Sequence, residues 1–112
     1  MLSRLASEFA AEIKNHDWSD AHIRTDRAGH DRARDSRKSR DLPPLSAEET
    51  NRIRVNVMWV VSQVLGHRDS NFNVVEFAAA CGVTGLSPGE LQSGLRQEDG
   101  IYAKPGSWNM GG

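Results

Sequence analysis

The feature that most constrains the fold is an apolar stretch in the middle of the chain. Nine of the thirteen residues from 53 to 65 are apolar. Ser46 and Glu49 precede this stretch with the spacing of a capping box, in which the two side chains bind the first free amides of a helix. The β-branched valines also suit a strand, but the cap and the length favour a helix. Since so apolar a helix must be enclosed on most sides, we expect it to be the central one.

The central helix has one narrow polar arc, made by Arg52, Asn56 and Gln63. Gly66 follows the last apolar residue and suits the C-terminal stop of the helix, because glycine accepts the left-handed backbone found there. Trp59 lies at the border of the polar arc. A tryptophan at this position completes the edge of a core or anchors a partner protein.

The N-terminal segment is predicted to be an amphipathic helix over residues 1–15. Leu2, Leu5, Phe9 and Ile13 recur at helical spacing, and charged residues occupy the other faces. We therefore expect these four side chains to form its buried stripe.

Two short helices are predicted after the central one. The first begins at Asn73, has Glu76 at its third position and ends at Gly82. The second begins at Ser87, is followed at once by a proline suited to the first helical position, and closes near Gly100. Both starts carry the side chains that cap free helix amides.

The sequence thus predicts a mainly α fold, a small helical bundle with a charged, irregular excursion after the first helix. With 112 residues, the chain has enough material for one core. We divide it into an N-terminal helix (1–15), a charged polar arm or linker (16–44), a helical core domain (45–100) and a C-terminal tail that packs on the core (101–112).

Residues 76–96 carry a pattern known from DNA-binding proteins. A small residue, Ala78, is followed by a turn glycine, Gly82, and an apolar residue, Val83, while Leu91 and Leu95 stand as apolar anchors of the second helix. This pattern resembles the helix-turn-helix unit. The resemblance implies that the second helix docks on DNA.

Two features of this segment depart from the helix-turn-helix pattern. The turn is about three residues longer than the family's short turn, and the second helix carries Glu90 and Glu98 against the single cation of Arg96. The bland alternative is therefore a packed pair of helices in a bundle. If the pair binds DNA, the candidates for contacts with bases or phosphates are Gln92, Ser93, Arg96 and Gln97.

The polar arm is the second feature that suggests nucleic acid. Residues 24–40 hold seven basic residues against three aspartates, a local charge of +4, although the whole chain has a net charge of -1. Basic side chains in such an arm neutralise phosphates, whereas interspersed aspartates are typical of a solvated linker. The candidate phosphate contacts are Arg24, Arg27, Arg32, Arg34, Arg37, Lys38 and Arg40.

A metal site and an enzyme are the more remote interpretations. His16, His22 and His30, with nearby aspartates, are ligands that suit divalent metals, as in a metal-dependent hydrolase. Their spacings of six and eight residues do not fall on one helical face, and Cys81 is the only cysteine. The sequence has no nucleophile elbow, phosphate-cradling loop or zinc-protease motif. We therefore predict a non-enzymatic protein without a cofactor.

The location is predicted from what the chain does not contain. Glu8 and Glu12 interrupt the apolar run that a signal peptide would need, and residues 57–61 form the longest apolar stretch, too short to span a membrane. One cysteine excludes an intrachain disulfide and fits a reducing compartment. We expect a soluble, cytoplasmic protein with no membrane association.

Two functions follow from these features. The first is a small regulatory protein, for example of transcription, that binds DNA through the helix pair and the basic arm. The alternative is a protein-binding module or inhibitor that acts on a partner protein through Trp59, Tyr102 and Trp108.

Overall fold

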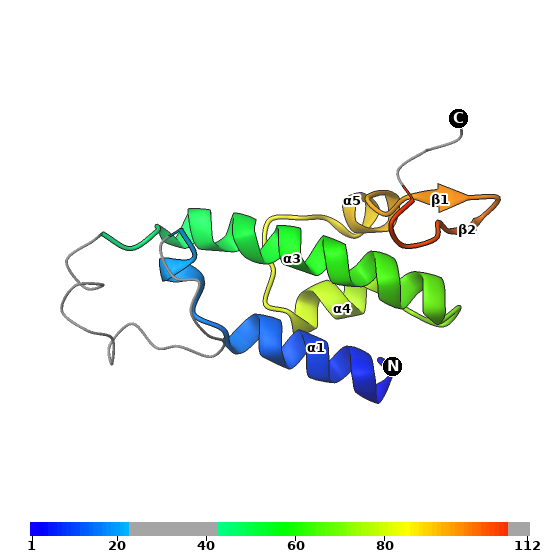
Figure 1. Ribbon diagram of the computed structural model, residues 1–112, viewed down its shortest axis with the longest axis horizontal. Helices are drawn as coiled ribbons and strands as arrows, with labels where there is room; N and C mark the ends of the chain where they lie inside the picture. The colour runs from blue at the N-terminus through cyan, green and yellow to red at the C-terminus, as the bar shows by residue number, and fades with distance from the viewer. Residues whose placement is uncertain (23–42, 108–112) are drawn as a thin grey trace.

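A computed structural model describes residues 1–22 and 43–107, and this part of the chain is mainly helical, which confirms the predicted fold class at that level. A long central helix, α3, has α1 and α4 packed along one side and α5 with a small hairpin along another (Figure 1). α1 and α3 run in opposite directions. The elements are α1 (Arg4–Asn15), the 3-10 turn η1 (Trp18–Asp20), α3 (Ala47–Arg68), α4 (Val74–Ala80), α5 (Pro88–Ser93), β1 (Gln97–Glu98) and β2 (Ile101–Tyr102).

The central helix α3 begins at the predicted capping box. The Glu49 amide donates to Ser46 Oγ over 3.1 Å, and the Ser46 amide donates to Glu49 Oε1 over 2.9 Å. The bond from the Ser46 amide, followed by that from its hydroxyl, lowers the pKa of the Glu49 carboxyl from its ordinary 4.5, because both bonds stabilise the charged form.

Among the described residues, no helix is both long enough and apolar enough to cross a membrane.

The predicted stop at Gly66 is wrong, because α3 continues through it to Arg68 and is capped by Asp69. Gly66 has another role. The Tyr102 ring lies against its backbone, and a Cβ at residue 66 would come within 2.3 Å of Tyr102 Cδ2. Gly66 therefore leaves the space in which the Tyr102 ring packs on the helix, and it does not end the helix.

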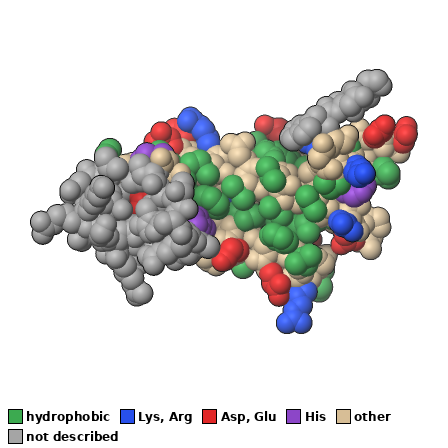
Figure 2. Space-filling view, viewed as in Figure 1, with side chains coloured by type: hydrophobic (Ala, Val, Ile, Leu, Met, Phe, Trp, Pro, Cys, Tyr) green, Lys and Arg blue, Asp and Glu red, His purple; other side chains and the backbone are tan. Residues whose placement is uncertain are grey.

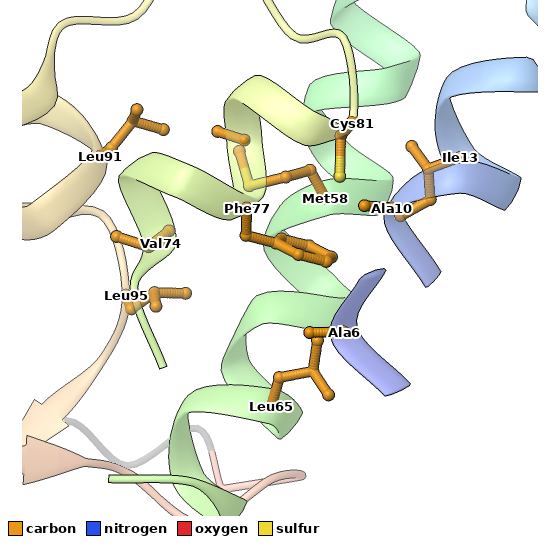
Figure 3. Close-up of a cluster of buried hydrophobic side chains, with 11 residues drawn as sticks. Ala6, Ala10, Ile13, Met58, Leu65, Val74, Phe77, Cys81, Leu91 and Leu95 are labelled. Carbon is orange, nitrogen blue, oxygen red and sulfur yellow. The ribbon is translucent and has the colours of Figure 1, made fainter. Parts of the chain in front are cut away.

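The core lies between α1, α3 and α4 (Figure 3). Phe77 is fully buried and points from α4 toward α3 and α1, where Met58 and Ala10 lie. Ser62 is also buried, and its hydroxyl lies 3.3 Å from Met58 Sδ. The buried apolar residues are Ala6, Ala10, Ile13, Met58, Leu65, Val74, Phe77, Ala78, Cys81, Leu91 and Leu95.

The buried stripe of α1 differs from the predicted one. Ala6, Ala10 and Ile13 are buried, whereas Leu5 and Phe9 are exposed. The two alanines allow α1 to lie close to both α3 and α4, because a methyl side chain keeps two helix backbones near each other. The leucine and the phenylalanine are thereby turned to one flank of the helix.

α4 begins and ends where the sequence predicts. The Glu76 amide donates to Asn73 Oδ1 over 3.1 Å at its start. At its end, the amides of Gly82 and Val83 each donate over 3.1 Å to carbonyls of the last turn, with Gly82 at a φ of 78°. This pair of bonds is a Schellman motif, and it needs the left-handed residue that glycine supplies without strain.

α5 starts at the predicted cap residue, Ser87, which forms a capping box with Glu90, but the helix is much shorter than predicted. It ends at Ser93 instead of near Gly100, and the chain then forms the antiparallel pair β1 and β2. Asp99 and Gly100 connect the strands, both with positive φ, 54° and 81°. Two successive left-handed residues make a type I′ turn, whose twist matches a hairpin.

Candidate functional site

The residues that resemble a helix-turn-helix pack α4 and α5 into the core. Ala78, Leu91 and Leu95 are buried, Val83 is half-buried, and Gly82 turns the chain. Leu95 lies beyond α5, in the segment that leads to the hairpin. These positions account for the apolar part of the pattern by core packing alone.

The lengthened turn between the two helices is fastened to α3. The Asn51 side chain donates from Nδ2 to the Thr84 carbonyl over 2.9 Å and accepts from the Thr84 amide over 3.1 Å. The side-chain amide thus serves both backbone groups of one turn residue, as a neighbouring strand would.

The four candidate DNA contacts do not share one helix. Gln92 and Ser93 are exposed on α5, whereas Arg96 lies in the following loop and Gln97 in β1. A bond of 3.4 Å from Gln97 Nε2 to the Gln92 carbonyl links two of them. α5 has six residues, about 9 Å of helix, and Glu90 is its only charged residue. The helix therefore presents no basic surface.

Several predicted site residues lie outside the described residues. These are Arg24, Arg27, Arg32, Arg34, Arg37, Lys38, Arg40, His30 and Trp108. The structure therefore bears on the helix pair and on the surfaces of α1 and α3, and the arm stays as the sequence predicts it.

The two described histidines of the metal hypothesis lie near η1. The His16 ring packs on the Trp18 ring at 4.3 Å between centroids, while His22 is exposed. Asp17 accepts from the Ser19 amide at 3.0 Å and from its hydroxyl at 2.6 Å, which caps η1. Within residues 1–22 and 43–107, no group of three or more His, Cys, Asp or Glu is arranged to hold a metal ion.

Gln63 holds the base of the hairpin against α3. Its Nε2 donates to the carbonyls of Arg96 and Ala103, each over 3.0 Å, and its Oε1 accepts from the Arg96 amide over 2.9 Å. The side chain is buried, so its position on a polar arc does not mean exposure to solvent. The helical wheel cannot distinguish an amide that faces water from one that binds backbone.

Trp59 and Tyr102, the predicted anchors for a partner, are both half-buried and both rest on glycines. A Cβ at Gly94 would come within 2.3 Å of Trp59 Cη2, just as one at Gly66 would meet the Tyr102 ring. One face of each ring is therefore committed to the fold. The rest of Trp59 contributes to a groove beside α3.

This groove runs between α3 and the segment from Gly94 to Gly106 and has a volume of about 350 Å³. One wall carries Trp59, Val60 and Val64, and the other carries Leu95 and Pro105. Gln63 and Trp59 fix the distance between the walls, because both bind the second segment directly. The groove is thus a built feature of the fold, lined mainly by apolar side chains.

The face of α3 beside the groove is open, which corrects the expectation of a helix enclosed on most sides. Val60 is 70% exposed and Val64 is 41% exposed. On α1, Leu5 is 56% and Phe9 41% exposed. Figure 2 shows hydrophobic side chains gathered over α3 and α1 on the face toward the viewer.

The helical periodicity of α1 indicates that the two exposed pairs border the same face. Lys14 of α1 lies beside Gly82 at the end of α4, because a Cβ at residue 82 would be 3.2 Å from Lys14 Cγ. Leu5 and Phe9 lie on the opposite flank of α1's buried stripe, by the helical periodicity, and so on the side of α3. We call Leu5, Phe9, Val60 and Val64 the apolar face.

Basic side chains gather at one end of the groove. His67, Arg68 and Lys104 line a shallow hollow together with Pro105, which also lines the groove. Arg68 and Lys104 are exposed and make no ion pair with any residue in the described ranges. Figure 2 shows Lys, Arg and His side chains at the hairpin end of the apolar surface.

No protein-family model, no curated protein and no solved structure matches this chain. The groove, the apolar face and the basic hollow must therefore be interpreted from their own chemistry.

Proposed function

We propose that the protein is a protein-binding module and that its receiving surface is the groove with the adjoining apolar face. The observation that carries this proposal is Val60, which is 70% exposed on the helix that also supplies Met58 and Leu65 to the core. A contiguous apolar surface beside a preformed groove is a common mark of an interaction site.

The size of the surface favours a short segment over a second copy of the chain. The four part-exposed side chains of the apolar face amount to roughly 300–400 Å², which is a single patch. A standard stable interface buries about 800 Å² on each partner. A flat contact between two copies would need much more apolar surface than this face supplies.

The spacing of the anchors favours a helical segment. Val60 and Val64 are four residues apart and form a ridge along α3. An amphipathic helix laid beside this ridge places its own apolar residues, at every third or fourth position, between the valines and Pro105. We therefore infer that the occupant is an amphipathic helix of another protein.

The groove is preorganised for such a partner. The clamp of Gln63 on Arg96 and Ala103 and the seat of Trp59 on Gly94 hold its two walls in place before anything binds. Binding to a rigid groove avoids the ordering entropy that a mobile surface loses.

The hypothesis of DNA binding now depends on the arm. α5 has no basic side chain, and Arg96 is half-buried in a loop, so the described residues give the helix pair no phosphate-binding surface. Binding through residues 24–40 stays a prediction from the sequence, and salt-dependent binding of random duplex DNA tests it.

The proposed function is tested by selection from a displayed library of random 16-residue peptides on the full-length protein. We expect enriched peptides with apolar residues at helical spacing, and at least tenfold weaker binding to Val60→Asp. Ala11→Asp is the matched control, because it adds the same charge to an exposed helix position outside the groove. Ala11→Asp should bind the selected peptides as tightly as the wild type does.

Three outcomes contradict the proposal. One is a library that yields no enriched peptide. Another is a set of peptides that bind Val60→Asp as tightly as the wild type. The third is a wild-type dimer in sedimentation that Val60→Asp converts to monomer, which would assign the face to a second copy of the chain.

A further inference from the structure

The groove ends at the basic hollow. The inference drawn from this arrangement deepens the proposed function and rests on it. We propose that the partner helix is acidic at one end: its apolar residues occupy the groove, and its carboxylates meet Arg68 and Lys104. The chemistry of the partner is thus that of an acidic amphipathic peptide.

The geometry of α3 places the apolar and basic contacts in one row. Val60, Val64 and Arg68 follow each other at intervals of four residues, so they lie on neighbouring turns of the same helix face. A segment that lies along α3 therefore meets two valines and then a guanidinium. Its path leads toward the end of α3 that faces the hairpin (Figure 1).

The opposite wall supplies the second cation at the same end. Lys104 lines the hollow with Arg68, and Pro105 is shared between the hollow and the groove. The two cations therefore come from different segments, α3 and the chain after β2. A carboxylate at the end of a bound helix would lie between them.

Among the described residues, no carboxylate forms an ion pair with either of these two cations. By contrast, Arg52 pairs with Glu48 and Arg4 with Glu8, whereas Lys14 of α1 is exposed without an ion pair among the described residues. A cation at the last turn of α3 also complements the helix dipole, which is a structural reason for Arg68. That reason does not extend to Lys104, which lies outside the helix.

An acidic peptide fits this surface better than a nucleic acid does. Phosphates would satisfy the two cations, but the adjoining row of valines carries no charge for a strand, and the aromatic ring that lines the groove, Trp59, already has one face packed on Gly94. Apolar anchors followed by carboxylates match the whole surface. Charges at the rim of such an interface chiefly increase the association rate and the selectivity.

The experiment repeats the peptide selection on three proteins: the wild type, the double variant Arg68→Gln/Lys104→Gln, and Arg52→Gln as the matched control on the same helix. We expect Asp and Glu to be enriched beside the apolar positions on the wild type and on Arg52→Gln. On the double variant, the apolar pattern should persist and the acidic enrichment should disappear. A selected peptide should bind the double variant about three- to tenfold more weakly at low salt, as the loss of two exposed ion pairs predicts.

The outcomes separate this inference from the function on which it rests. Peptides with the apolar pattern but no acidic enrichment would overturn the inference and leave the proposed function standing. Acidic enrichment that persists on the double variant would also overturn it. A lack of any enriched peptide would overturn both. Displacement of a bound acidic peptide by a single-stranded oligonucleotide, lost in the double variant, would reassign the hollow to nucleic acid.

Discussion

Two sides of α3 hold the protein together by different means. On one side, Met58 and Leu65 pack with Phe77 in an apolar core whose contacts depend on volume and area. On the other side, Gln63 and Trp59 hold the chain after α5 by hydrogen bonds and by a ring on a glycine. The first side, which we call the core side, gives the fold its stability. The second, which we call the hairpin side, fixes the shape of the groove. Variants on the two sides should therefore differ in kind as well as in size.

The largest effect is expected on the core side, from Phe77→Ala. Phe77 is fully buried between α4, α3 and α1, so its removal loses the transfer free energy of the ring and leaves a cavity. The expected cost is about 3–5 kcal/mol of unfolding free energy, measured by urea denaturation. Phe72→Ala, at a half-buried position beside it, should cost clearly less. Equal costs would mean that the core is not centred on Phe77.

The next prediction compares two glycines and tests the packing of the Trp59 ring on Gly94, on the hairpin side. Gly94→Ala should cost about 1–3 kcal/mol, because the new Cβ would lie 2.3 Å from the Trp59 ring. Gly89→Ala should instead stabilise by about 0.4–1 kcal/mol, since its Cβ meets only Ser87 Oγ at 3.9 Å and glycine is a poor helix residue. Thermal unfolding of both variants shows whether alanine is harmful only where a ring packs on the glycine. A stability change of the same sign in both variants would contradict the contact between Gly94 and the Trp59 ring.

A smaller effect is expected from the amide clamp, again with a matched partner. Gln63→Ala leaves the backbone groups of Arg96 and Ala103 without their bonds to α3. The expected cost is about 1–2 kcal/mol, in the lower half of the usual range because water reaches the hairpin edge. Asn51→Ala removes a similar but exposed pair of bonds to Thr84 and should cost less. Chemical denaturation of the two variants gives the comparison, and a larger cost for Asn51→Ala would contradict it.

The helix starts could be predicted because their causes are local. Ser46, Asn73 and Ser87 each accept a hydrogen bond from an amide three residues later, and such caps are visible in sequence spacing. The extent of a helix is less local. Gly66 lies inside α3, where Tyr102, 36 residues further on, packs against it, and no property of residues 60–70 indicates that contact.

The sequence also contains a signal for the hairpin, which conflicts with the long helix predicted from the cap at Ser87. Asp99 and Gly100 form the dipeptide that most favours a type I′ turn, and its presence argues against a helix that closes near Gly100. By contrast, the stripe of α1 offered two adjacent choices. Leu5 and Phe9 are the more hydrophobic, but the close packing of three helices selects the alanines.

The candidate site was only partly predictable. The sequence leaves Trp59 as either the edge of a core or an anchor for a partner; its ring packs on Gly94 and also lines the groove. The sequence does not distinguish Val60 and Val64 from core residues, because periodicity cannot show which part of an apolar helix lacks a neighbour. The basic hollow combines Arg68 with Lys104, 36 positions apart in the chain, and only the hairpin brings them together.

The last prediction concerns a core-side group whose titration lowers the stability of the fold only in alkali. Burial raises the pKa of the Cys81 thiol from 9.0 to about 12, and the charge of Arg54 offsets only a smaller part. A raised pKa in the folded state means that the stabilisation is fully present below the unfolded value, near 9. It is lost as the pH rises from there toward 12. At one pH unit above the unfolded pKa, the loss should be about 1 kcal/mol.

Other groups also titrate in alkali, so the informative quantity is the difference between the wild type and Cys81→Ala. Unfolding free energies of both proteins, measured by urea denaturation at pH 7 and near pH 10, should differ by an amount that shrinks with pH, because only the wild type carries the buried thiol. A difference that stays constant between the two pH values would place the thiol in contact with water. The centre of the core side would then be looser than its packing around Phe77 indicates, and the contrast with the hairpin side would narrow.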